Sequence, residues 1–302
     1  MLSPRNLRLD FAPEWIALAA VAVLDLVWAW AIGFHLTVTW TDGKLLGLAL
    51  AVTLGLKFLP LRGDWAKGGV MAEYFSLTTA AALVFAVLSY LSLSSSGPVM
   101  IDDQLMAADR ALGFDWMAGY YFLKASPVIA RILQIAYESL VYQGLYFCVL
   151  FALMGDRRHL RDMFWLFLVA AIMTSTIVLL LPAFGPFKAL GTAPPGSFLV
   201  DAELLKNGVK SFALIKLAGV VDFPSFHTTM ALAYVWGFRK AGPVFWPLAV
   251  LNLLMMAAVP WYGGHYLMDM VAGGAVMLAA LAVVKLAPRL KFSPAQPQAA
   301  YS

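Results

Sequence analysis

The chain has 302 residues, of which 62% are hydrophobic and only 13% are charged, and its mean hydropathy is +0.80. So little charge cannot cover the surface of a soluble domain, and the composition therefore excludes a soluble globular protein. The net charge of +4 is explained by basic residues in loops between apolar segments. Nothing in the chain resembles a nucleic-acid-binding module. The single cysteine, Cys148, allows neither an intramolecular disulfide nor a cysteine-based metal site.

Apolar segments long enough to cross a membrane recur along the chain and predict an all-α, polytopic transmembrane bundle. The first segment is too long for a signal sequence and is not followed by a small-x-small cleavage site, so we expect it to remain as a membrane helix. About eight spans are expected, at residues 15–38, 43–60, 70–93, 128–154, 161–183, 226–238, 243–260 and 265–286.

Basic residues fall in every second loop of this arrangement. By the positive-inside rule, these loops and both termini are expected in the cytoplasm. The residues that carry this prediction are Arg5, Arg8, Arg62, Lys67, Arg157, Arg158, Arg161, Arg239, Lys240, Arg289 and Lys291.

Two loops on the outer side, 94–127 and 184–225, are long for a minimal bundle, and long ordered loops are usually functional. We expect residues 102–114 to form an amphipathic helix at the interface, although a surface cap without chemistry is the alternative. Three regions are predicted: 1–69 with two extra transmembrane helices, a catalytic membrane core at 70–291, and a disordered cytoplasmic tail at 292–302.

The sequence Pro-Ser-Phe-His at 224–227 opens the span 226–238 on the outer side. Ser225 is a plausible N-cap, and the free N–H groups of a helix N-terminus favour an anion such as phosphate. His227 lies in the first turn, where it can donate a proton to a leaving oxygen. Taken alone, these residues would favour a helix cap and a structural histidine at the interface.

A second polar pair opens the last span, where His265 is followed by Asp269 at i+4 on the same helix face. A carboxylate there can accept the Nδ1–H of the imidazole, which leaves Nε2 as a nucleophile. A structural histidine–aspartate pair is the alternative. Because the predicted topology brings both motifs to one side of the membrane, a joint catalytic role is the favoured hypothesis.

The two stretches resemble the second and third signature motifs of the type 2 phosphatidic acid phosphatase (PAP2) superfamily. That resemblance implies His265 as the nucleophile, Asp269 as the residue that orients it, and His227 as the acid. It also implies a six-helix core that matches residues 70–286, with the two preceding helices as an extension.

The chain departs from the family pattern at both motif arginines. Ala258 and Val259 stand where the third motif usually begins with Ser-Arg, and Lys188 is followed seven residues later by Pro195 without the arginine of the first motif. This pattern looks like the branch of inositol phosphorylceramide synthases and related bacterial PAP2 proteins. Because a doubly charged phosphomonoester favours arginine clamps, the loss favours phosphodiester chemistry.

The predicted function is thus an integral membrane lipid phosphatase or phospho-headgroup transferase, acting on a lipid phosphate or phospholipid at the extracytoplasmic face of a bacterial inner membrane. Ser225, Lys188, Thr228 and Tyr266 are the expected substrate-binding residues. We expect neither a metal nor a cofactor, and a metal site formed by His227, His265 and Asp269 is the alternative. A non-catalytic lipid-binding or scaffold protein of the same fold is the alternative, and a transporter is a weaker one, since no inverted repeat is visible. The sequence does not specify an oligomeric state.

Overall fold

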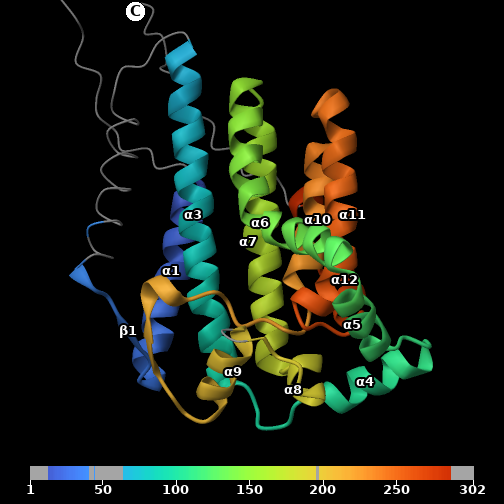
Figure 1. Cartoon of the computed structure of the whole chain (residues 1–302). Helices are drawn as coiled ribbons and strands as arrows, with labels where there is room; N and C mark the ends of the chain where they lie inside the picture. Colours follow the sequence, from blue (N-terminus) through green and yellow to red (C-terminus); the bar gives the residue numbers. More distant parts are fainter. Residues whose placement is uncertain (1–12, 41–43, 45–63, 195–196, 287–302) are drawn as a thin grey trace, which may run out of the picture.

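The computed structural model describes residues 13–40, 44, 64–194 and 197–286, and within them the chain is a bundle of long helices (Figure 1). Six of these helices are long and apolar enough to cross a membrane. They are α1 (Pro13–Ile32), α3 (Asp64–Ser95), α6 (Pro127–Leu153), α7 (Arg157–Leu180), α11 (Phe245–Tyr262) and α12 (Leu267–Leu286). The predicted polytopic helical bundle is confirmed.

Three of the predicted spans need comment. The span 43–60 lies outside the described residues apart from Lys44. The span 226–238 forms helix α10 (Phe226–Phe238), whose 13 residues extend about 20 Å and fall short of the ~30 Å hydrocarbon core. The first span, predicted to reach residue 38, ends at Ile32 because the chain turns at Gly33, which has a φ of 68°.

A cap of short elements covers one end of the bundle, at the bottom of Figure 1. It includes α4 (Asp102–Ala111), α5 (Trp116–Ala125), α8 (Pro186–Leu190), α9 (Phe198–Lys206), the strands β1 (His35–Thr37) and β2 (Ser211–Ala213), and a 3-10 turn, η1 (Leu214–Lys216). The strands pair in parallel with His35 opposite Ser211, so the segment after α1 is tied to the second long loop. The helix expected at 102–114 is α4, and its Leu105 is buried.

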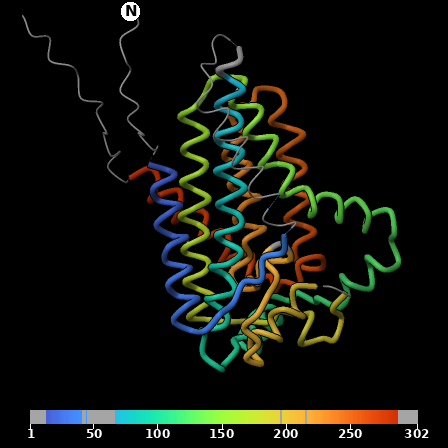
Figure 2. The backbone as a smooth tube through the Cα atoms, turned by 90° about the vertical axis from the view of Figure 1, so that its left-hand side faces the viewer, coloured from blue at the N-terminus to red at the C-terminus, as the bar shows by residue number. Residues whose placement is uncertain are grey.

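Helix α10 lies at the centre of the bundle and packs against α6, α7, α11 and α12. Its buried Phe238 and Ala233 lie among core side chains such as Phe151 of α6, Leu166 of α7 and Ala280 of α12. Helix α1 lies at one side of the bundle, against α3 and α7 (Figure 2). The same view shows α5 and the first turns of α6 standing out sideways.

The opposite end of the bundle has the turn between α6 and α7 and a second 3-10 turn, η2 (Gly242–Val244). There Lys240 pairs with Asp156 at 3.0 Å. Arg157, Arg158, Arg161, Arg239 and Lys240, on which the topology prediction depends, lie in or beside these turns, while the cap contains both aspartates and lysines.

Candidate active site

Helix α10 begins at the cap end with Ser225 as its N-cap residue. The Ser225 hydroxyl oxygen accepts hydrogen bonds from the backbone N–H of Thr228 at 3.3 Å and from the Thr228 hydroxyl at 3.2 Å. Both side chains are buried, and neither lines the cavity described below. The structure therefore gives both residues a capping role, and their predicted contact with substrate stays a prediction.

His265 lies in the short loop that joins α11 to α12. Its Nδ1 is 3.3 Å from an Oδ2 oxygen of Asp269, which also accepts the backbone N–H of Tyr266 at 2.7 Å. The pair that the i+4 spacing predicts is present, but α12 begins at Leu267, so His265 precedes the helix and does not share a helix face with Asp269. The loop turns at Gly264, whose φ is +64° and where a Cβ atom would come within 2.4 Å of the Phe187 ring.

The side chain of His265 is 3% exposed. Burial lowers its pKa to about 4, and a backbone hydrogen bond with Asp222 acts in the opposite direction. His265 is therefore neutral at physiological pH. With the proton on Nδ1 facing Asp269, the lone pair is on Nε2, as a nucleophile requires.

The two motifs are joined by direct contacts between α10 and α12. The backbone N–H of Ser225 donates to the carbonyl oxygen of Asp269 at 3.0 Å, and the Thr229 hydroxyl donates to the carbonyl oxygen of Gly273 at 2.9 Å. The helices approach so closely here that a Cβ atom on Gly273 would lie 2.4 Å from the Ser225 carbonyl oxygen. These contacts fix the position of one histidine-bearing segment relative to the other.

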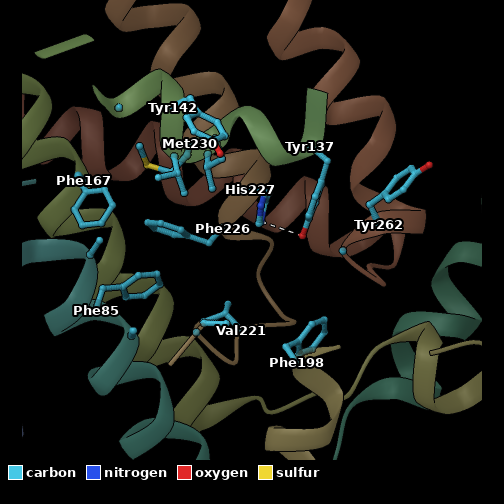
Figure 3. A pocket seen from close by; sticks show the side chains of 18 of the residues that line it. Phe85, Tyr137, Tyr142, Phe167, Phe198, Val221, Phe226, His227, Met230 and Tyr262 are labelled. Carbon is cyan, nitrogen blue, oxygen red and sulfur yellow. Dashed lines mark hydrogen bonds between the residues drawn. The ribbon is translucent and has the colours of Figure 1, made fainter. Parts of the chain in front are cut away.

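His227 and His265 both line one cavity of about 800 Å³. Figure 3 shows its wall, in which His227 lies among Phe85, Phe167, Phe226 and other apolar side chains. Lysine and arginine are absent from the described lining residues, which are mainly aliphatic and aromatic.

The cavity opens toward the membrane between α3 and α6. Its lining includes Phe75 of α3 and Val141, Tyr142 and Leu145 of α6, and all four side chains are also exposed on the surface of the bundle. The cavity therefore has an open side on the face of the bundle between α3 and α6.

Tyr137 of α6 was not singled out by the sequence, yet it holds His227 in place. Its hydroxyl group is 3.3 Å from Nδ1 of His227, and the two rings stack at a centroid distance of 4.0 Å (Figure 3). The predicted role of His227 as an acid would then use Nε2, and that role stays a prediction. The sequence does not predict this contact between Tyr137 and His227, because it depends on how α6 packs against α10.

Two further predicted substrate-binding residues lie away from the cavity. Lys188 forms an ion pair with Glu203 of α9, and its side chain is half-exposed. Tyr266 is buried, and its hydroxyl group donates to Asp102 at 3.3 Å. Among the described residues, His227 and His265 are thus the predicted site residues that line the cavity.

Two aspartates of the first long loop, which the sequence analysis did not single out as site residues, support the segment around His265. Asp109 accepts the backbone N–H groups of Leu267 and Met268, at 2.8 and 3.2 Å, and so caps α12 from another helix. Asp102 accepts the backbone N–H of Gly185 at 2.7 Å.

Donor atoms of Asp222, His265 and Asp269 lie within 4.8 Å of one another, a spacing that a divalent cation could bridge. A cation there would compete for the His265 Nδ1 that already faces Asp269. The expectation that these residues act in proton chemistry without a metal stays a prediction.

A family model described as the PAP2 superfamily matches residues 103–283, more than half of the chain. The matched region contains both histidines, Asp269 and the aspartates that support them. No curated protein and no solved structure gives a match.

Proposed function

Because the chain belongs to the PAP2 superfamily, whose members are phosphatases or phosphotransferases, we propose that it cleaves the phosphate ester of a lipid through a phosphohistidine intermediate. The observation that carries the proposal is the shared cavity: both histidines line one apolar space that opens sideways toward the membrane. A lipid can place its chains in this space and its phosphate at the histidines.

In the proposed first step, Nε2 of His265 attacks phosphorus, and the bond from phosphorus to the leaving oxygen breaks. His227 gives its proton to that oxygen, while Asp269 stabilises the positive charge that develops on the His265 ring. In the second step, the oxygen of water or of an alcohol attacks phosphorus and the N–P bond breaks. His227 then recovers a proton from the attacking group.

Hydrolysis and headgroup transfer share this intermediate and differ in the acceptor. The described lining of the cavity has no lysine or arginine, which suits the single charge of a phosphodiester better than the double charge of a phosphomonoester. We therefore propose transfer of a phospho-headgroup to a sphingolipid, as in inositol phosphorylceramide synthases, with hydrolysis of a lipid phosphomonoester as the second candidate.

The proposed setting is a bacterial inner membrane with both termini in the cytoplasm and the cap end outside. Helix α10 is too short to span the hydrocarbon core, so its first turn, which contains His227, would lie below the outer headgroups. That depth suits a substrate that arrives from the bilayer.

The test incubates purified protein in detergent with phosphatidic acid and, in parallel, with phosphatidylinositol plus ceramide, and separates the products by thin-layer chromatography. A new phosphosphingolipid that is lost in His265→Ala would support headgroup transfer, whereas free phosphate lost in the same variant would support hydrolysis. Turnover by His265→Ala at the wild-type rate would overturn the nucleophile assignment. If the wild type formed no product from either lipid or from other phospholipid donors, a non-catalytic lipid-binding protein would be favoured.

A further inference from the structure

Asp222 is a buried carboxyl group beside the nucleophile that the proposed reaction does not use. It lies in the loop before α10, its side chain is 1% exposed, and its Oδ1 is 3.8 Å from Nδ1 of His265. The chain closes over it at Gly185, whose φ is +81° and where a Cβ atom would come within 2.3 Å of the same oxygen. Asp222 is therefore sealed from water by backbone.

The other carboxylates around this loop all accept hydrogen bonds. Asp102 and Asp109 accept backbone N–H groups, and Asp269 accepts the Tyr266 N–H through Oδ2. Asp222 differs, because neither of its oxygens has a hydrogen-bond partner among the described residues. A bare carboxylate in such a place would have a large desolvation cost.

Asp269 can supply the hydrogen-bond partner that the Asp222 carboxyl group lacks. Its Oδ1 is also buried and without a hydrogen-bond partner among the described residues, and an oxygen of each carboxyl lies within 4.8 Å of the other. Two adjacent carboxyl groups with unpaired oxygens are both accommodated when one proton lies between them, because one then donates and the other accepts.

We propose that Asp222 is the protonated member of a carboxyl pair with Asp269, donating its O–H to Asp269 so that the pair has a single negative charge facing Nδ1 of His265. The proton belongs on Asp222 because Asp269 already has the Tyr266 N–H to stabilise its charge. Burial, with Asp269 and Asp102 nearby, also raises the pKa of the Asp222 carboxyl well above its usual range.

This inference rests on the proposed phosphohistidine chemistry and gives Asp222 the role of a positioning residue. The shared proton holds Asp269 in the orientation that accepts from His265. It also removes a second negative charge that would repel an incoming phosphate anion.

The first test compares Asp222→Asn with Asp222→Ala, using Asp103→Asn on the exposed face of α4 as the matched control. An asparagine amide can donate to Asp269 as the proposed O–H does, so we expect Asp222→Asn to keep kcat within about threefold of wild type, while Asp222→Ala loses about tenfold or more. Equal losses in the two variants would show that an ionised carboxylate is required, and would overturn the proposal.

The second test needs no turnover and no alanine variant. Infrared difference spectra should show a protonated carboxylic acid C=O band in the wild type and in Asp103→Asn that Asp222→Asn lacks. An unchanged band in Asp222→Asn would overturn the proposal, as would stoichiometric bound zinc that the same variant loses. Because the spectrum is independent of catalysis, a wild type that turns over no lipid would contradict the proposed function without deciding this inference.

Discussion

His227 and His265 line the same cavity, but their Nδ1 atoms have different partners. Nδ1 of His265 faces the carboxylate of Asp269, which stabilises positive charge on the ring. Nδ1 of His227 faces the neutral hydroxyl group of Tyr137. A ring beside a carboxylate suits covalent bonding to phosphorus, whereas a ring beside a phenol suits an exchangeable proton, so the partners themselves favour the two proposed roles.

The Tyr137 hydroxyl group gives a prediction at this scale. Tyr137→Phe keeps the ring that stacks on His227 but removes the hydrogen bond to Nδ1, so kcat should fall about tenfold, the effect of losing roughly 1.4 kcal/mol. The KM for the lipid should change little, because the apolar surface remains. The measurement is steady-state turnover of the lipid identified by chromatography.

Tyr146→Phe is the matched control, since Tyr146 lies on the same helix, is partly exposed and does not line the cavity. Wild-type kcat in Tyr137→Phe would show that the hydroxyl group does not position His227.

At the scale of elements, the site depends on the contact between α10 and α12, where two adjacent glycines have different surroundings. Gly273 faces the Ser225 carbonyl oxygen across the helix interface, whereas a Cβ atom on Gly274 would meet only Leu232 at an ordinary 3.6 Å. Gly273 therefore permits the close approach of the helices, whereas the approach does not depend on Gly274.

We therefore expect Gly273→Ala to lower the free energy of unfolding by about 2 kcal/mol, because the helices must separate to admit the methyl group. Activity should fall with it, since the same separation breaks the hydrogen bond from the Ser225 N–H to Asp269. Thermal unfolding in detergent and lipid turnover would check the two effects.

Gly274→Ala is the control and should be neutral or stabilising by up to about 1 kcal/mol, the usual gain of alanine over glycine within a helix. Equal stability of the two variants would show that the close approach at Gly273 is not required.

The elements that the sequence predicted are those with a regular signal. Spacing predicted the His265–Asp269 pair, and hydropathy located six of the long helices, four of them with both ends within four residues. Tyr137, Asp109 and Asp222 had no such signal, because each acts on a partner more than 40 residues away in the chain. Which aspartates of the first long loop meet the His265 loop depends on how α4 packs against α12.

At the scale of the whole molecule, the bundle has two unlike ends. The cap, the histidines and their aspartates lie at one end, and the Asp156–Lys240 pair lies at the other. Because the proposed chemistry lies at the capped end, the orientation of the bundle decides which leaflet supplies the lipid. Orientation is therefore the property that connects the fold to its substrate.

Cysteine labelling in intact cells tests this orientation. Val99, in the capped end's first loop, and Arg158, near the turn between α6 and α7, are both exposed and lie at opposite ends of the bundle. With the basic loops in the cytoplasm, a membrane-impermeant maleimide should label Val99→Cys from outside and Arg158→Cys only after permeabilisation. The native Cys148 is buried and should stay unlabelled, which makes the unsubstituted protein the control. The reverse pattern would put the histidines on the cytoplasmic side and would require the lipid donor to come from the inner leaflet.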